Sequence, residues 1–330
     1  MDPADFFATS RVVIVAGKGG VGKTAVSAAM ARAAARTGLS TLIIDVEGKS
    51  GMAALFGQAP YDYEEAVLSP AGTPDGAAEV RGRSLTPDDA LIEYLQDHGM
   101  SRVSRRLAHS GAVDMVSTAA PGIKDILILG KVKQLERMKG NDLVVLDAPA
   151  AGHAISFLRS PRGLIDAVRM GPINAQARDV LDLLTDPKRC QVVLVTLPEE
   201  TPVNELVETA YSLEDEVGVS LGPVVVNALY DELPGLDVDP EEAAAAAGAH
   251  LHPGEAASLR AAAEFRLDRI ALQREQVKRL AEQLPLPQLH LPYVFSAGLG
   301  PEHLDTLADS LLTSIKGLHG LAGAGGGAPA

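Results

Sequence analysis

A glycine-rich loop near the start of the chain constrains the fold more than any other feature. Residues 12–34 read VVIVAGKGGVGKTAVSAAMARAA, so the pattern G-x-x-x-x-G-K-T lies between an apolar run and an alanine-rich stretch. A buried strand, this loop and then a helix form the context in which such a loop binds the phosphates of a nucleotide. The glycines let backbone N–H groups converge on phosphate oxygens, and the helix N-terminus adds the positive end of its dipole. The sequence therefore predicts a nucleotide-binding α/β domain.

The apolar runs along the chain predict an α/β domain with a doubly wound, mostly parallel sheet, and together with the glycine-rich loop they indicate a P-loop NTPase fold. The runs lie at 11–17, 40–46, 142–148, 191–197, 222–228 and 287–293, with a weaker candidate at 77–85. They do not alternate with polar residues, as is typical of strands buried on both faces.

Helical stretches follow most of these runs. They are predicted at 23–37, at 202–217 with Pro202 in the first helical position, and at 256–284. The last of these has an apolar face made of Leu267, Ile270, Val277, Leu280 and Leu284.

Two regions interrupt the alternation of strand and helix. Residues 86–140 and 153–186 contain helical sequence, and the second is interrupted by SPRG and RMGPINAQ. We interpret both as a helical subdomain inserted into a single P-loop ATPase domain over residues 1–315. Its apolar residues line a client groove or a subunit interface, or form the subdomain's own core; they are Met115, Ile126, Leu127, Leu129, Leu158, Leu164, Ile165, Val168 and Met170. The Gly/Ala-rich segment 316–330 is predicted to be disordered.

Charge and cysteine content limit the function classes. The 29 Lys and Arg against 43 Asp and Glu give a net charge of −14, which disfavours non-specific binding of nucleic acid. A small basic group at Arg102, Arg105 and Arg106 is either a local patch or a solvated helix face. With Cys190 as its one cysteine, the chain has no intrachain disulfide and no Cys pair for zinc, an iron–sulfur cluster or a metalloid. We expect a buried Cys190, a cytoplasmic protein, no secretory signal and no integral membrane segment.

The loop residues carry distinct parts of the chemistry of ATP and Mg²⁺. Lys23 neutralises the β- and γ-phosphate charge, and the Thr24 hydroxyl ligates Mg²⁺. Ala25 takes the place of the second hydroxyl found in many such loops, so only its backbone N–H serves the α-phosphate. The remaining predicted phosphate contacts are Gly17, Lys18, Gly19, Gly20, Val21 and Gly22.

Two aspartates follow strands at the edge where the phosphates are expected. Asp45 is a turn former or helix cap, or it orients and deprotonates the attacking water and lies at the metal. Asp147 follows four apolar residues, which is the Walker B arrangement with Asp in the Mg²⁺ shell. Gly152, in the APAAGH segment that follows, is a candidate γ-phosphate contact and hinge. His153 is a relay or a plain surface histidine.

The loop needs only the lysine side chain of Lys23 for its phosphates, so the side chain of Lys18 has no role in that scheme. It remains solvated, or it reaches the nucleotide of a facing subunit and stabilises charge on the transferred phosphoryl group. The sequence GKGGVGKT resembles the deviant Walker A loop of dimeric ATPases, a class that includes the Min and Par proteins, the nitrogenase iron protein and the ArsA-type ATPases. The resemblance implies that Lys18 crosses a nucleotide-sandwich dimer and makes hydrolysis depend on dimerisation.

The segment DAPAAGHAISFL resembles the switch II of the ArsA-type family, which contains the arsenite-pump ATPase and the guided-entry factor for tail-anchored membrane proteins. LIEYL and APGIKDILILGKV resemble its helical subdomain, and the resemblance covers most of residues 10–315. It implies that Asn227 contacts the adenine and that Pro292 flanks the base. Without the resemblance, both are strand-end turn residues.

The chain departs from the family pattern in several places. Switch I reads Asp45-Val46-Glu47-Gly48 instead of Asp-Pro-Ala-His, a variant associated with bacterial, particularly actinobacterial, members. The arsenite-binding cysteines and the zinc Cys-x-x-Cys are missing, segment 153–186 is shorter than a transmembrane client needs, and the usual Glu-Ile-Arg-Gly is replaced by residues 296–300.

These features predict a Mg-ATP-dependent dimeric ATPase switch of the ArsA type. It would act as a homodimer or as a heterodimer with a paralogous ATPase, and it would bind a protein partner or a membrane-protein client. One alternative is a Min/Par-type positioning ATPase, disfavoured by the Gly-rich end and the negative charge. Another is a nucleotide-binding regulatory subunit, disfavoured by the complete set of catalytic residues. A redox role like that of the nitrogenase iron protein is excluded, because its cluster needs two cysteines per subunit.

Overall fold

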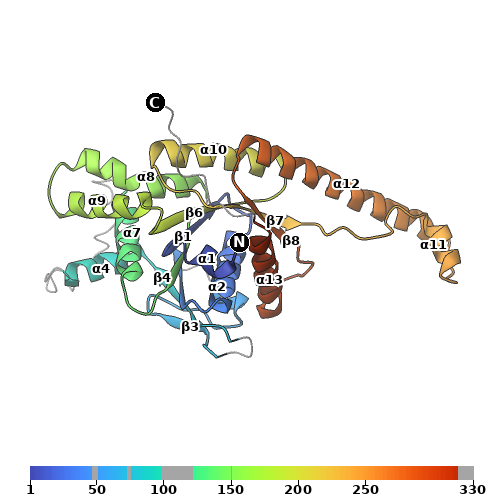
Figure 1. Ribbon diagram of the computed structural model, residues 1–330, viewed down its shortest axis with the longest axis horizontal. Helices are drawn as coiled ribbons and strands as arrows, with labels where there is room; N and C mark the ends of the chain where they lie inside the picture. Colours follow the sequence, from blue (N-terminus) through green and yellow to red (C-terminus); the bar gives the residue numbers. More distant parts are fainter. Residues whose placement is uncertain (47–50, 73–75, 98–121, 150, 319–330) are drawn as a thin grey trace.

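The computed structural model describes residues 1–46, 51–72, 76–97, 122–149 and 151–318. Its centre is an eight-stranded sheet in the order β3-β4-β2-β5-β1-β6-β7-β8, with helices on both faces (Figure 1). The strands are β1 Val12–Gly17, β2 Thr41–Val46, β3 Ala66–Ser69, β4 Val80–Leu85, β5 Leu143–Asp147, β6 Cys190–Thr196, β7 Val224–Leu229 and β8 Gln288–Pro292. Every neighbouring pair is parallel except β3 and β4.

The six main predicted strands are confirmed within one or two residues. The weaker candidate at 77–85 is also confirmed and contains β4, which begins three residues later than predicted. Every residue of β1, β2 and β5 is buried, because helices cover both faces of the sheet. The sequence did not indicate β3. This edge strand has only four residues, and its Val67 is 49% exposed, so it lacks the apolar run of a buried strand.

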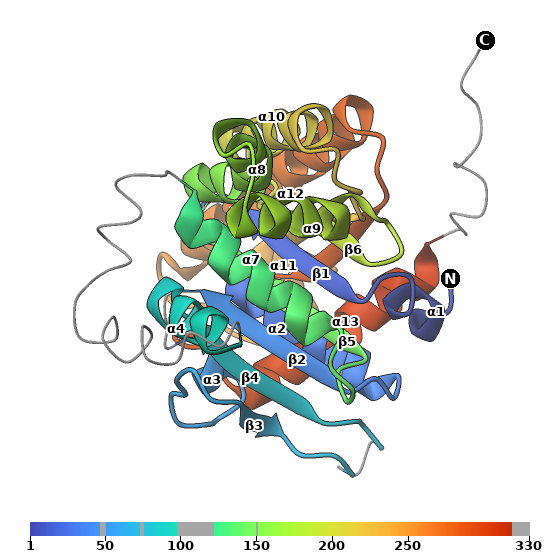
Figure 2. The same cartoon turned by 90° about the vertical axis from the view of Figure 1, so that its left-hand side faces the viewer.

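Each face of the sheet carries its own layer of helices and its own apolar core. One face packs against α1 Pro3–Phe7, α2 Lys23–Arg36, α3 Gly51–Leu55 and α13 Pro301–Gly317. The other packs against α7 Ile123–Glu136, α8 Ala151–Ala167, α9 Pro172–Thr185, α10 Glu200–Glu216 and the C-terminal part of α12 Glu255–Gln283. Figure 2 shows α7, α8 and α9 lying over this second face. Two further helices, α4 Pro87–Asp97 and α11 Pro240–Ala246, complete the described set.

The helices of the expected insertion pack directly on the sheet. Ile126, Leu129, Leu158 and Leu164 are buried in the same core as β1 and β5, rather than in a core of their own. Ile165 and Val168 pack against that core, Leu127 is half-buried, and Met170 is 86% exposed. Met115, like Arg102, Arg105 and Arg106, lies outside the described residues. The described apolar residues thus serve mainly as core and not as an open groove.

Four local predictions were wrong. SPRG does not interrupt α8, which runs through Pro161. Proline has no N–H to donate to the carbonyl four residues earlier, Phe157 O, and the Ser160 hydroxyl donates to that oxygen instead, at 2.8 Å. Helix α10 begins at Glu200, so Pro202 is its third residue, still in the first turn, where N–H groups have no helical acceptor.

The other two concern helix ends and faces. Helix α13 continues to Gly317, so the first residues of the predicted tail are helical, and 319–330 lie outside the described residues. In α12, Ile270, Leu280 and the adjoining Leu284 are buried, but Leu267 is 40% exposed. The reason is that α11 and the start of α12 project beyond the sheet (Figure 1). No described helix combines the length and the apolarity that crossing a bilayer requires.

The single cysteine provides a direct test of the core. Cys190 starts β6 and is fully buried, as predicted, and burial raises the pKa of its thiol to about 12. At pH 8, only about one such thiol in ten thousand is ionised, and reagents attack the thiolate. We expect no measurable reaction of the native protein with Ellman's reagent over minutes, and one thiol per chain in guanidinium chloride. A full reaction of the native protein within seconds would contradict the buried position of β6.

Candidate nucleotide-binding site

The glycine-rich loop lies at the topological switch point of the sheet, where the strand order reverses. It joins β1 to α2, and β1 lies between β5 and β6. The chain passes from β1 to β2 on one side and, later, from β5 to β6 on the other side of β1, so the loop opens into the crevice at the carboxyl ends of the strands, where open α/β sheets bind ligands. The register places Asp147 of β5 beside Val15, two residues before the loop.

The backbone of the loop requires glycine at specific positions. Gly20 and Gly22 have φ values of 85° and 88°, in the left-handed region that strains other residues. A Cβ on Gly22 would also lie 2.4 Å from Nδ2 of Asn227, whereas a Cβ on Gly19 would meet nothing within 4 Å. The outer rim of the loop is therefore open, and its inner side is closed by Asn227.

Lys23 lies inside the loop. Lys23 is only 8% exposed, and its ammonium group donates to the carbonyl oxygen of Lys18 at 3.0 Å. A buried cation at a helix N-terminus, surrounded by turning backbone, is the donor set that phosphate oxygens require. The loop therefore fits the phosphates of a nucleotide. Val21 is buried beneath the loop, and Ala25 lies in the first turn of α2.

The two aspartates predicted to act together are neighbours in the sheet. Asp45 of β2 pairs in register with Asp147 of β5, and they are 3% and 5% exposed. The Thr24 hydroxyl donates to Oδ2 of Asp147 at 2.7 Å, and the Ser27 hydroxyl donates to Oδ1 at 3.2 Å. A threonine hydroxyl held against a carboxylate fits the oxygen ligands that Mg²⁺ prefers. Ser27 is a member of this group that the motif alone did not indicate.

The side chain of Lys18 is bonded to a residue outside its own loop. Its side chain is 50% exposed, and its ammonium group pairs with Oε1 of Glu205 on α10. Glu205 was not predicted, because it lies 187 residues away in a helix with no motif. In the single chain, Lys23 and Lys18 thus occupy two different places, one inside the loop and one outside it.

A hollow of about 250 Å³ adjoins the loop at the ends of β7 and β8. Its lining residues include Gly22, Asn227, Tyr230, Gln273 and Tyr293. The Asn227 amide donates to the carbonyl oxygen of Val21 at 2.9 Å, which ties β7 to the loop. Pro292 ends β8 and is not among the lining residues of this hollow, where its neighbour Tyr293 is present instead.

The bend that shapes this hollow is stabilised by one buried glutamine. Ala228 has φ of 62°, a left-handed conformation that costs a non-glycine residue about 1–2 kcal/mol. Gln273 of α12 donates to the Ala228 carbonyl at 3.0 Å and accepts from the Tyr230 N–H at 2.8 Å. Sequence patterns did not indicate this role, since Gln273 appears as one polar residue on a mostly polar helix.

The switch segments are only partly described. Gly152 is the second residue of α8, and a helix N-terminus is a position from which a backbone N–H can meet an anion. Residues 47–50 and 150 lie outside the described residues, as do the side chains of 151–153. The roles of Gly152 and His153 therefore stay predictions.

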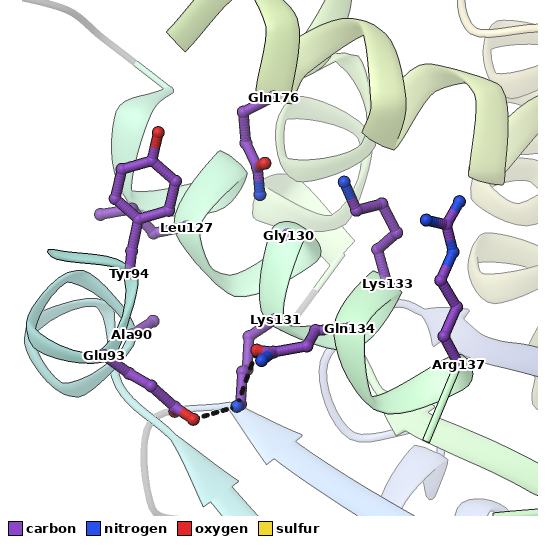
Figure 3. Close-up of a pocket in the computed structure, with 10 residues that line it drawn as sticks. All are labelled: Ala90, Glu93, Tyr94, Leu127, Gly130, Lys131, Lys133, Gln134, Arg137 and Gln176. Carbon is purple, nitrogen blue, oxygen red and sulfur yellow. Dashed lines mark hydrogen bonds and ion pairs between the residues drawn. The ribbon is translucent and has the colours of Figure 1, made fainter. Parts of the chain in front are cut away.

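A second hollow, between α4, α7 and α9, shares no lining residue with the first. Figure 3 shows Glu93 of α4 and Gln134 both joined to the ammonium group of Lys131 on α7. Burial acts to raise the pKa of Glu93, but the bonds from Lys131 and the Tyr63 hydroxyl outweigh it and hold that pKa below its usual value. The ion pair between Glu93 and Lys131 holds α4 against α7 in the layer over the sheet.

Comparison with known proteins identifies relatives over almost the whole chain. Residues 10–171 match the family model of the ArsA, or anion-transporting, ATPases. ATPase BagA of Mycobacterium tuberculosis is 31% identical over 324 residues, covering 91% of this chain and 92% of the relative. ATPase get3 of Aspergillus terreus is 24% identical over 213 residues, covering 63% of this chain and 58% of the relative.

Gly22→Ala tests the loop geometry, and Gly19→Ala is its matched control. The left-handed φ and the contact with Asn227 should lower the melting temperature of the nucleotide-free Gly22→Ala variant by about 3–6 °C and abolish ATP binding. Gly19 has neither constraint, so its variant should melt within about 1 °C of wild type. The measurements are thermal unfolding and calorimetric titration with ATP. Equal melting temperatures for the two variants would contradict the loop described here.

Proposed function

The chain belongs to the ArsA-type anion-transporting ATPase family, and we propose that it works as a Mg-ATP-dependent dimeric switch. In this proposal, ATP closes a dimer of two facing chains, and Lys18 of each chain completes the site of the other. Hydrolysis reopens the dimer and so times the binding of a protein partner. The ATPase activity itself follows from the family.

The outward position of Lys18 is the observation that carries the proposal. Lys23 already supplies the cation inside the loop, and Lys18 is held on the far side by Glu205. An exposed pair of this kind contributes only about 0.2–1 kcal/mol, so a facing nucleotide can compete for the lysine. A cation that arrives with the partner stabilises the charge of the transferred phosphoryl group, as an arginine finger does.

The other residues divide the chemistry among them. Bound Mg-ATP supplies the phosphoanhydride bond and a divalent charge that polarises it. Lys23 and the N–H groups of the loop bind the β- and γ-phosphates, and Thr24 and Asp147 would hold the Mg²⁺ ion. Asp45 orients the attacking water and accepts its proton, since its carboxylate is buried beside Asp147 at the phosphate edge. Asn227 and the adjoining hollow take the base.

A homodimer satisfies this scheme without any further component. Each chain carries every other residue of the proposed site as well as the lysine that crosses, so two copies form two complete sites. A paralogous ATPase that carries the same lysine is the alternative partner. In both cases we propose that the dimer, and not the single chain, is the active species.

We do not propose arsenite as a substrate that this chain binds. Arsenite is bound by soft thiolate ligands, and the one cysteine here is buried, with a pKa raised to about 12. A protein client is the better proposal. A membrane protein with a single hydrophobic segment is the less favoured kind of client, because segment 153–186 is shorter than a transmembrane client needs. The partner surface would form only when the dimer closes.

Lys18→Ala tests the proposal directly. We expect kcat for ATP to fall by a factor on the order of 10²–10³, because a transition-state cation is lost, while ATP affinity changes less than about threefold. In the wild type, specific activity should rise with protein concentration, and ATP should double the mass measured by light scattering. Full activity of Lys18→Ala, or activity independent of concentration, would overturn the dimer switch and leave a monomeric ATPase.

Glu205→Gln is the companion variant, because it releases Lys18 without touching the loop. We expect its specific activity at low protein concentration to exceed that of the wild type by up to about fivefold, the equivalent of an exposed ion pair. At saturating protein concentration the two should agree. A fall in activity at every concentration would show that Glu205 supports catalysis and does not restrain Lys18.

A further inference from the structure

Two aromatic side chains that follow neighbouring strands line the hollow beside the phosphate loop: Tyr230 after β7 and Tyr293 after β8. We infer that Arg266 of α12 positions this aromatic wall for the nucleotide base, because its guanidinium group stacks on Tyr230 and on Phe295. This deepens the function proposed above and rests on the base entering the hollow. No motif in the sequence includes Arg266.

The rings come from two segments of the chain and form one cluster. Tyr293 meets Tyr230 edge-to-face, with ring centroids 5.1 Å apart, and its centroid lies 4.6 Å from that of Phe295. Aromatic pairs attract each other at these separations. However, Tyr293 is 42% exposed and Phe295 is 67% exposed, so burial alone holds these rings only weakly. The cluster therefore needs a further contact to keep one arrangement.

Arg266 supplies that contact from the side of α12. The central carbon of its guanidinium group lies 4.4 Å from the ring centroid of Tyr230 and 5.1 Å from that of Phe295. Its Nη2 also donates to the carbonyl oxygen of Asp231 at 3.0 Å. A guanidinium group is planar, so it can stack on rings while its edge donates hydrogen bonds. Arg266 thus joins the segment after β7 to the segment after β8.

A second residue of α12 fixes the backbone from which the Tyr230 ring extends. Gln273 donates to the carbonyl oxygen of Ala228 and accepts from the Tyr230 N–H. Residues 266 and 273 are seven positions apart, so they lie on one face of the helix. This face therefore holds Tyr230 at two points, the backbone through Gln273 and the ring through Arg266.

An ordered aromatic wall has a consequence for nucleotide binding. A base stacks on aromatic rings, and a site whose rings are ordered beforehand loses less free energy when the base enters. Tyr230 and Tyr293 line the hollow, whereas Arg266 is not among its lining residues. Arg266 therefore acts through the rings and is a positioning residue. Its loss should weaken binding of the base and leave binding of the phosphates unchanged.

Arg266→Gln removes the planar charge, and Arg274→Gln on the same helix is its matched control. Arg274 pairs with Glu232 and does not line the hollow. We expect Arg266→Gln to weaken binding of Mg-ADP about three- to tenfold, the range of one cation–π contact. Binding of pyrophosphate, which has no base, should change less than about twofold. For ATP hydrolysis, KM should rise while kcat stays within about twofold of wild type.

Calorimetric titration and steady-state kinetics measure these values, and Arg274→Gln should match the wild type in all of them. An unchanged affinity of Arg266→Gln for ADP would overturn the inference. Equal losses for ADP and pyrophosphate would also overturn it, because they would show a general disturbance of the fold.

A double-mutant cycle with Phe295→Leu tests whether Arg266 acts through the rings. If it does, the loss of ADP affinity in the double variant should be smaller than the product of the two single losses. Losses that simply multiply would overturn the inference. The dimer switch is tested separately, since ADP binding needs no facing copy. Wild-type protein that bound ADP no more tightly than pyrophosphate would overturn both the base hollow and the role of Arg266.

Discussion

The in-register pairing of β2 with β5 is the constraint on which the rest of the site depends, because it sets Asp45 beside Asp147. Neighbouring strands lie about 4.8 Å apart, so two buried carboxylates repel each other unless donors and cations face them. Thr24 and Ser27 donate to Asp147, and the buried ammonium group of Lys23 lies in the adjoining loop. The first turns of α2 supply all three of these groups, so the phosphate loop and the carboxylate pair stabilise each other.

The loop is also bonded to the other half of the sheet, where the hollow lined by Asn227 lies. Asn227 bonds to the loop at Val21, and Gln273 of α12 holds the strained bend beside Asn227. A few hydrogen bonds thus join the loop, this hollow and α12. A change at the nucleotide therefore has a short physical route to α12, and equally to α10 through Lys18 and Glu205.

Sequence patterns predicted those parts of the molecule that depend on local order. The buried strands, the loop and the positions of Asp45 and Asp147 follow from apolar runs and from one motif, and the structure brings them together as expected. The strand β3, the passage of α8 through Pro161 and the contacts of Glu205 and Gln273 were not predictable. Each depends on a partner distant in sequence, such as the 187 residues between Lys18 and Glu205. The inserted helical subdomain stays a prediction, and the described helices α7, α8 and α9 share the core of the sheet.

The central claim is that Lys18 completes the site of a facing copy, and mixing two inactive variants tests it most directly. Lys18→Ala keeps Asp45, and Asp45→Asn keeps Lys18. If the lysine crosses, a mixed dimer contains one complete site, and an equimolar mixture should recover about one quarter of the wild-type ATPase rate when copies exchange at random. If Lys18 serves its own chain, no site is complete, and the mixture should show only the sum of the two residual activities. That second result would contradict the account.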